Sequence, residues 1–212
     1  MNLDKKIVLA SGNKGKVREF VKMFTDLGLN IVPQTELGVG DVEETGTTFV
    51  ENAIIKARYA AEITGMPAIA DDSGIEVDYL NGVPGIYSAR YSTLAGSGEY
   101  GGDSKDANNN LKLLDALKDV DDDALRTARY QCILVYMRHA ADPTPIICQA
   151  AWEGIIMREE VGDNGFGYDP LFWVPEHQLS SAQLDPDIKN GMSHRGKALR
   201  LLHDELTALY AK

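Results

Sequence analysis

Cysteine and basic residues are scarce in this sequence. Its 212 residues include 2 Cys, and 21 Lys and Arg stand against 32 Asp and Glu. Cys132 and Cys148 form no C-x-x-C pair and have no histidine at metal-ligand spacing, so neither a zinc site nor a redox motif is indicated. Both cysteines fit buried strand positions, where they would act as small apolar residues.

The formal net charge of -11 argues against a protein that coats nucleic acid, because such binding depends on Lys and Arg that neutralise phosphates. We expect no nucleic-acid partner, although a local basic pocket is compatible with an acidic chain. Long apolar runs are also lacking. The opening MNLDKKIVLASG has too short a run for a signal peptide, and no later stretch approaches a membrane span. We therefore expect no membrane partner and a cytoplasmic location.

The first part of the chain predicts alternating strands and helices around a core, which the hydrophobic content of 44% can fill. Short apolar runs predict strands at 6–10 and 28–37, with a helix over 17–28 between them. A second helix is predicted over 48–64, where Thr48 and Glu51 have the spacing of a capping box. PAIADDSGIEVD, residues 67–78, predicts a strand, an acidic turn and a second strand.

The second part begins with LAGSGEYGGDSKDANNN, residues 94–110, whose polar and glycine-rich composition predicts a mobile surface segment before a helix at 111–120. Residues 126–139 and 145–157 predict two long strands joined by a hairpin turn. A final helix is expected after Ser193, with a core-facing stripe of Leu199, Leu202, Leu206 and Leu209. The whole pattern predicts an α/β fold around a mixed sheet, with residues 1–212 forming a single two-lobed domain.

SGNKGKVREF, residues 11–20, lies between the first predicted strand and helix, where a P-loop would lie. Its spacing is not that of a P-loop, because Gly12 and Gly15 are too close together and Val17 follows Lys16 where a hydroxyl should hold magnesium. Two interpretations stay open for this stretch alone. It is either an anion site built from a helix N-terminus and two lysines, or an ordinary turn whose lysines face water.

Acidic residues cluster at Glu43 and Glu44 and again at Asp71 and Asp72. Paired carboxylates at the end of a buried strand need a neutralising partner, and magnesium suits a sparse set of oxygens because it shares its remaining positions with water and phosphates. The alternative is that the aspartates cap a turn and the glutamates are solvated.

Basic and aromatic residues complete a possible nucleotide site. The candidate cations are Lys14, Lys16, Lys56, Lys189 and Arg195, which fall near predicted element ends or clefts. In GFGYDP a base could stack on Phe166 or Tyr168 while the backbone and Asp169 meet its edge. Phe172 and Trp173 fit the core better. Acids for magnesium, lysines for phosphate and a glycine-aromatic loop for a base together indicate a nucleoside triphosphate.

Five ordered stretches closely resemble the inosine triphosphate pyrophosphatase family: SGNKGKVREF, EETGTTFVENAIIKA, ADDSGIEVDYLNGVPGIYSARY, GFGYDPLF and SHRGKAL. The likeness runs from about residue 7 to 203. It implies an elongated α/β fold with a long mixed sheet, flanking helices and two lobes around a deep cleft, and it implies a magnesium-dependent homodimer. The implied reaction is hydrolysis of ITP, dITP or XTP to the monophosphate and pyrophosphate, by attack of water at the α-phosphorus.

The resemblance also implies roles for individual residues. Asp72 matches the general base, and Glu44 and Asp72 match the metal-binding acids. The triphosphate-binding turn is matched by Ser11, Gly12, Asn13, Lys14, Gly15 and Lys16. Further substrate contacts are matched by Lys56, Ser73, Phe166, Gly167, Tyr168, Asp169, Lys189, His194 and Arg195.

Selectivity for hypoxanthine or xanthine over adenine requires a donor to the O6 atom and an acceptor for N1–H. Our hypothesis assigns the donor to Arg195, and the acceptor to Asp169 or a backbone carbonyl. Two other functions fit these residues less well. A non-catalytic purine nucleotide sensor would have little reason to retain both Glu44 and Asp72, and an enzyme cleaving at the γ-phosphate would need the P-loop spacing that is missing.

Overall fold

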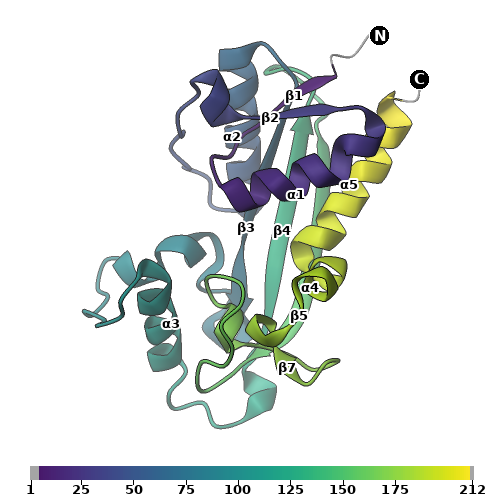
Figure 1. Cartoon of the computed structure of the whole chain (residues 1–212). Helices are drawn as coiled ribbons and strands as arrows, with labels where there is room; N and C mark the ends of the chain where they lie inside the picture. Colours follow the sequence, from purple (N-terminus) through teal and green to yellow (C-terminus); the bar gives the residue numbers. More distant parts are fainter. Residues whose placement is uncertain (1–4, 211–212) are drawn as a thin grey trace. The chain divides into compact units, whose positions relative to one another are not determined.

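A computed structural model describes residues 5–210 (Figure 1). The helices are α1 (Lys14–Phe24), α2 (Phe49–Thr64), α3 (Lys105–Ala116), α4 (Pro186–Met192) and α5 (His194–Tyr210). The strands are β1 (Lys6–Leu9), β2 (Asn30–Pro33), β3 (Ala68–Val77), β4 (Thr127–Met137), β5 (Ile146–Ile156), β6 (Phe172–Val174) and β7 (Leu179–Ser180). Short 3-10 helices cover Thr25–Leu27, Gln34–Leu37, Asp78–Leu80, Gly85–Thr93, Asp123–Leu125, Asp169–Leu171 and Ser181–Gln183.

The strands form a 7-stranded sheet in the order β2-β1-β3-β4-β5-β6-β7. β1 pairs in parallel with β2 and with β3, whereas β6 pairs antiparallel with β5 and with β7. The sheet is therefore mixed, which confirms the predicted α/β class.

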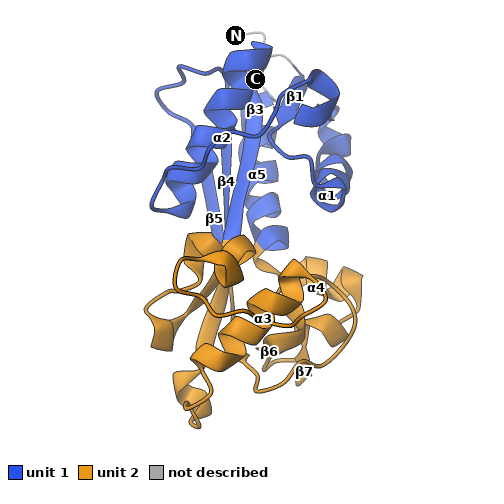
Figure 2. Ribbon diagram, turned by 90° about the vertical axis from the view of Figure 1, so that its left-hand side faces the viewer, with its two compact units in different colours: residues 1–73, 132–150, 195–212 blue, residues 74–131, 151–194 orange. Residues whose placement is uncertain are grey.

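The chain divides into two compact units (Figure 2). Unit 1 comprises residues 1–73, 132–150 and 195–212, and unit 2 comprises residues 74–131 and 151–194. Each unit has its own apolar core, in which Phe20, Phe24 and Leu202 are fully buried in unit 1 and Leu113, Leu117 and Phe172 in unit 2. The single domain expected over residues 1–212 stays a prediction.

Several local predictions are confirmed. Thr48 caps α2, and Glu51 completes the capping box. α5 begins at His194, and its residues Leu199, Leu202 and Leu206 are buried while Leu209 is partly buried against the same core. Cys132 and Cys148 are free and buried in β4 and β5. Burial raises the pKa of the Cys132 thiol to about 12, as expected for a cysteine with a packing role.

Three local predictions are wrong. The strand predicted over 28–37 ends at Pro33, and Gln34–Leu37 forms a short 3-10 helix that closes at Gly38 in the left-handed region.

Residues 67–78 contain no acidic turn, because Ala68–Val77 is one continuous strand of 10 residues. The segment 94–110 is not all loop, because α3 begins at Lys105 with Ser104 as its N-cap. Asp, Gly and Asn have weak strand or helix preferences, and here the pairing of β3 with its neighbours and the side-chain contacts of α3 override them. Within residues 5–210, no helix is long and apolar enough to cross a membrane.

Candidate active site

The turn after β1 positions the first predicted set of residues. Asn13 is the N-cap of α1, and its side-chain oxygen accepts from the backbone N–H groups of Gly15 at 2.9 Å and Lys16 at 3.1 Å. Asn13 in turn donates its own N–H to Ser11 Oγ at 3.2 Å. Two N–H groups that the anion-site interpretation left free for phosphate are therefore capped from within the chain, and the lysine side chains are the stronger candidates for binding an anion.

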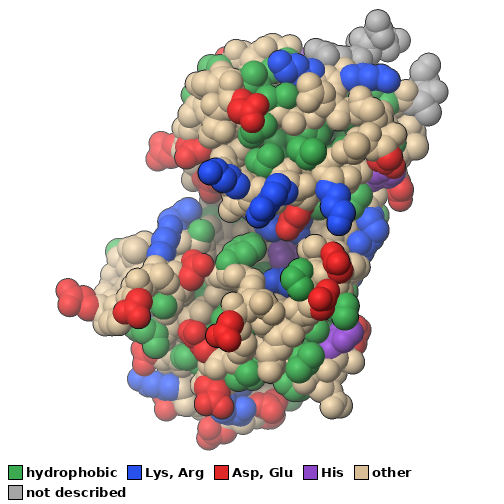
Figure 3. Space-filling view, viewed as in Figure 1, with side chains coloured by type: hydrophobic (Ala, Val, Ile, Leu, Met, Phe, Trp, Pro, Cys, Tyr) green, Lys and Arg blue, Asp and Glu red, His purple; other side chains and the backbone are tan. Residues whose placement is uncertain are grey.

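Basic side chains gather over α1, as Figure 3 shows, although the whole chain is acidic. The sequence of this helix, KGKVREFVKMF, places four basic residues against one acid. Lys14 is exposed and Lys16 is half-buried. A local positive field of this kind attracts a polyanion such as a triphosphate.

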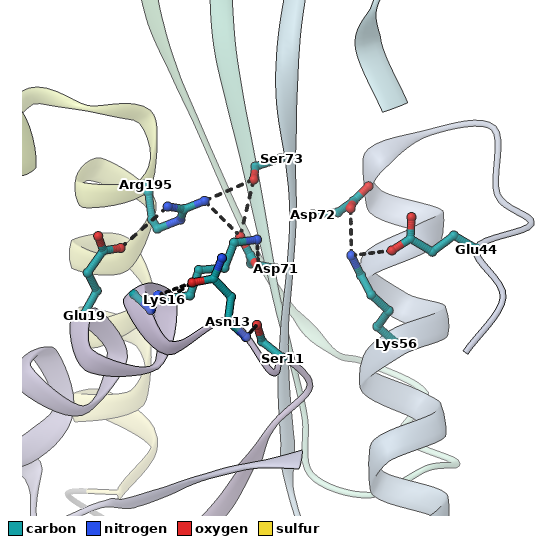
Figure 4. Close-up of polar contacts among 11 residues, drawn as sticks. Ser11, Asn13, Lys16, Glu19, Glu44, Lys56, Asp71, Asp72, Ser73 and Arg195 are labelled. Carbon is teal, nitrogen blue, oxygen red and sulfur yellow. Dashed lines mark hydrogen bonds and ion pairs between the residues drawn. The ribbon is translucent and has the colours of Figure 1, made fainter. Parts of the chain in front are cut away.

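Asp71 and Asp72 point to opposite faces of the sheet, because successive side chains of a strand alternate. Figure 4 shows Asp71 and Ser73 directed toward Lys16 and Arg195, whereas Asp72 is directed toward α2 and the loop that carries Glu44. The pair therefore cannot act as one two-carboxylate ligand, and each aspartate has its own set of partners.

The buried carboxylate of Asp71 pairs with two cationic side chains. Its side chain is 2% exposed, and its carboxylate lies 2.7 Å from Lys16 Nζ and 3.5 Å from Arg195 Nη2. Ser73 Oγ donates to Asp71 at 3.4 Å and accepts from Arg195 at 3.3 Å. Burial alone would raise the pKa of Asp71, but Lys16, Arg195 and Lys56 together hold the pKa well below its usual range. Asp71 therefore stays charged and orients two residues predicted to bind substrate.

Lys56 connects the two acids that the resemblance assigns to metal binding. Its ammonium lies 2.7 Å from Asp72 Oδ1 and 3.0 Å from Glu44 Oε1, and its side chain is only 17% exposed. Burial alone would lower the pKa of Lys56, but the carboxylates of Asp72, Asp71 and Glu44 raise it above the ordinary value. Burial raises the pKa of Asp72 despite Lys56, with Glu44 and Asp71 adding to the effect.

The side chains of Glu44 and Asp72 offer the type of ligand that magnesium binds. Both supply carboxylate oxygens, and magnesium commonly binds one or two protein carboxylates and completes its coordination shell with water and phosphate oxygens. Within residues 5–210, no group of three or more His, Cys, Asp or Glu side chains is arranged to hold a metal ion. Glu43 is exposed, and Asp71 lies on the opposite face of the strand from Asp72 and pairs with Lys16. Metal binding at Glu44 and Asp72 stays a prediction.

The loop GFGYDP in unit 2 exposes one aromatic ring and buries the other. Gly165 and Gly167 have φ angles of +83° and +63°, in the left-handed region that glycine tolerates best. Phe166 between them is 62% exposed, whereas Tyr168 is 4% exposed and donates its hydroxyl to the Ser88 carbonyl at 2.8 Å. A base could therefore stack on Phe166, while Tyr168 anchors the loop in the core.

Asp169 holds this loop together. One oxygen, Oδ2, accepts from the Phe166 N–H at 2.8 Å and from Lys189 Nζ at 2.5 Å, and the other accepts from Ser181 Oγ at 2.8 Å. The residue is 3% exposed. Its acceptor positions are largely used within the protein, which favours a backbone carbonyl over Asp169 as the acceptor for a base N1–H.

Lys189 and His194 also lie in unit 2 and pack against this region. Lys189 Nζ lies 5.8 Å from the centroid of the Phe166 ring, and the His194 ring stacks on Tyr130 with centroids 4.8 Å apart. Phe172, predicted as core, is fully buried, and Trp173 is half-buried. The substrate-binding roles predicted for all these residues stay predictions.

Comparison with known proteins places the chain in a family. The sequence profile of the Ham1 family matches residues 7–205. This chain belongs to the Ham1 family. It is 61% identical over 206 residues to a protein of Shewanella oneidensis named dITP/XTP pyrophosphatase, which covers 97% of this chain and 94% of that protein. It is 60% identical over 198 residues to a Vibrio cholerae protein of the same name, covering 93% of this chain and 94% of that protein.

Solved Ham1 structures have the same fold. A HAM1 protein from Coxiella burnetii superposes with a TM-score of 0.87 at 50% identity, covering 96% of this chain and 98% of that one. The Staphylococcus aureus Ham1 protein gives a TM-score of 0.83 at 39% identity, and the match covers 96% of this chain and 99% of that one.

The sequence alone did not reveal several residues that contact the predicted site residues within each unit. Asp71 pairs with Arg195, and the Glu19 carboxylate lies 3.7 Å from the same guanidinium. Ser181 donates its hydroxyl to Asp169. A strand assignment for residues 68–77 would have separated Asp71 from Asp72 by alternation. No local signal in the sequence indicates the contacts of Glu19 or Ser181, because both partners are distant along the chain.

Proposed function

We propose that this Ham1 protein is a hydrolase that converts non-standard purine nucleoside triphosphates, namely dITP, XTP and ITP, to the monophosphate and pyrophosphate. The observation that carries the proposal is identity of 56% or more, over at least 93% of this chain, to proteins named dITP/XTP pyrophosphatase. The proposed role is removal of damaged purines from the cytoplasmic nucleotide pool.

The residues of unit 1 support a role in phosphoryl chemistry. Lys16, held on Asp71, presents positive charge that suits the oxygens of a triphosphate and a leaving pyrophosphate. Glu44 and Asp72 would hold magnesium, which when bound would neutralise phosphate oxygens. Lys56 engages Asp72 through Oδ1, so Oδ2 is the atom to which we assign the proton of the attacking water.

The residues of unit 2 support recognition of a flat base. Phe166 supplies an exposed ring, and the loop around it is fastened by Asp169 and Lys189. Aromatic stacking does not distinguish among purines, so selectivity needs hydrogen bonds to O6 and N1–H. The assignment of Arg195 to O6 stays a prediction.

Product analysis tests the proposal. Purified protein with magnesium should release IMP and pyrophosphate from ITP, with little product from ATP or GTP. Asp72→Asn should lower kcat by at least about a hundredfold, since it removes the general base. Asp119→Asn, at an exposed position, is the matched control and should keep the wild-type rate.

Each alternative gives a different result. A nucleotide sensor would bind ITP with no turnover, and an enzyme acting at the γ-phosphate would release orthophosphate. Comparable turnover of ATP and ITP would refute the assigned substrate class.

We also propose a homodimer, on the resemblance of the chain to the inosine triphosphate pyrophosphatase family. Light scattering coupled to size exclusion should give twice the chain mass of 23.2 kDa. A monomer at micromolar concentration would contradict this assignment.

A further inference from the structure

Two side chains of α3 hold the peptide groups on both sides of Gly167. The Gly167 N–H donates to Asp106 Oδ2 at 2.9 Å, and the Gly167 carbonyl accepts from Asn110 Nδ2 at 3.1 Å. Asp106 and Asn110 are four residues apart, so they lie on the same face of the helix. Both they and the loop belong to unit 2, where Figure 2 shows α3.

The backbone conformation of Gly167 sets the direction of the chain between Phe166 and Tyr168. Its φ of +63° lies in the left-handed region, and it separates the exposed ring of Phe166 from the buried ring of Tyr168. Rotation of either flanking peptide would redirect the chain at Phe166. Tyr168 is anchored by its hydroxyl bond to Ser88, and Phe166 by its N–H bond to Asp169. The Phe166 carbonyl also accepts from the Asp169 N–H at 3.3 Å, and the two α3 side chains bind the N–H and the carbonyl of Gly167 between these anchors.

Asn110 has a feature that packing alone does not explain. It is 2% exposed, and among the residues that the structure describes its Oδ1 has no hydrogen-bond partner. A buried acceptor without a partner destabilises the fold, and an apolar residue of similar size would avoid this. The contact that the amide does make is the one to Gly167. Its neighbours in the NNN run serve other segments, since Asn108 bonds Gly102 and Asn109 bonds Ser92 and Ser88.

We propose that Asp106 and Asn110 are positioning residues for nucleoside recognition. By fixing both peptides at Gly167, they hold Phe166 where a purine base can stack on it. The inference rests on the proposed function and deepens it, because it assigns Asp106 and Asn110 to the binding of the base and not of the triphosphate.

The test separates base binding from phosphate binding. Asp106→Ala and Asn110→Ala should each raise KM for ITP about fivefold, the usual worth of one hydrogen bond, with kcat within about twofold of wild type. The inhibition constant of inorganic tripolyphosphate, which has no base, should not change. Asp106→Asn should recover most of the wild-type KM, because its amide oxygen can still accept from Gly167. The double alanine variant should raise KM by less than the product of the two single fold-increases, since both residues act on one loop.

Asn108→Ala is the matched control, since it removes two bonds from the same helix without touching Gly167. Its KM should equal that of wild type. Asp106 is exposed, so its alanine variant keeps the core intact and decides the question even if Asn110→Ala does not fold. Unchanged KM in Asp106→Ala, or an equal rise in the tripolyphosphate constant, would overturn the inference. Failure of the proposed function is distinguishable, because wild type would then release no pyrophosphate.

Discussion

Gly46 lies in the loop that brings Glu44 to Lys56, and it is packed too closely for any side chain. A Cβ at this position would lie 2.6 Å from Glu51 Cβ, 2.7 Å from Asn52 Oδ1 and 3.1 Å from the Asn52 backbone nitrogen. Its N–H also donates to Asn52 Oδ1 at 2.9 Å. The loop that carries a predicted metal ligand is therefore fastened to the first turns of α2.

Gly46→Ala should lower the free energy of unfolding by about 1–3 kcal/mol, because neither α2 backbone nor Asn52 can move away cheaply. It should also lower kcat, since Glu44 shifts with the loop. Urea unfolding and ITP turnover measure the two effects. Gly40→Ala is the control, because no described atom lies within 4 Å of its added Cβ. Equal stability of the two variants would show that the loop is looser than this geometry requires.

Among the elements, α2 depends on its capping box. Thr48 Oγ1 accepts from the Glu51 N–H at 3.3 Å, and Glu51 Oε2 accepts from the Thr48 N–H at 2.9 Å. Thr48→Ala should lower the free energy of unfolding by about 1 kcal/mol, the usual cost of losing such a cap. Thr207→Ala, at an exposed position of α5, should stay within about 0.5 kcal/mol of wild type. The experiment is urea denaturation. An unchanged free energy of unfolding in Thr48→Ala would mean that tertiary packing is sufficient to form the start of the helix without the cap.

Elements with a clear period and a cap were predictable, and elements made by tertiary contacts were not. α2 and α5 follow apolar spacing, and β4 and β5 follow long β-branched and aromatic runs. β3 was mispredicted at Asp71 and Asp72, whose charges are compensated by Lys16 and Lys56 from other elements. Propensity describes a residue among its neighbours in sequence, so it cannot include a cation that is 16 or 55 residues away.

For the whole molecule, Asp71 should contribute to stability in a pH-dependent manner. Its pKa in the folded state is held well below the unfolded value of about 3.9. A carboxyl with a lowered folded pKa stabilises the fold fully above its unfolded pKa, and this stabilisation is lost as the pH falls toward the folded pKa. Asp71→Asn should therefore be less stable by about 3 kcal/mol at pH 7, because Lys16 and Arg195 lose a buried counter-ion.

The difference in stability between wild type and Asp71→Asn should stay constant above about pH 5 and shrink below about pH 4. Urea unfolding at pH 7, 5 and 3.5 measures it. A difference that does not change with pH would mean that Asp71 acts through packing and not through its charge.

The sequence by itself determined the α/β class, most helices and long strands, and the motifs that resemble a nucleotide pyrophosphatase, because periodicity, capping and motif spacing are local properties of the chain. Only the tertiary structure decided which polar groups meet. It separated Asp71 from Asp72, joined Lys56 to Glu44 and Asp72, and buried Asp169 among Phe166, Lys189 and Ser181. These contacts depend on distances between segments far apart in the chain, and a charge or hydrogen bond acts only across the few ångströms that folding creates.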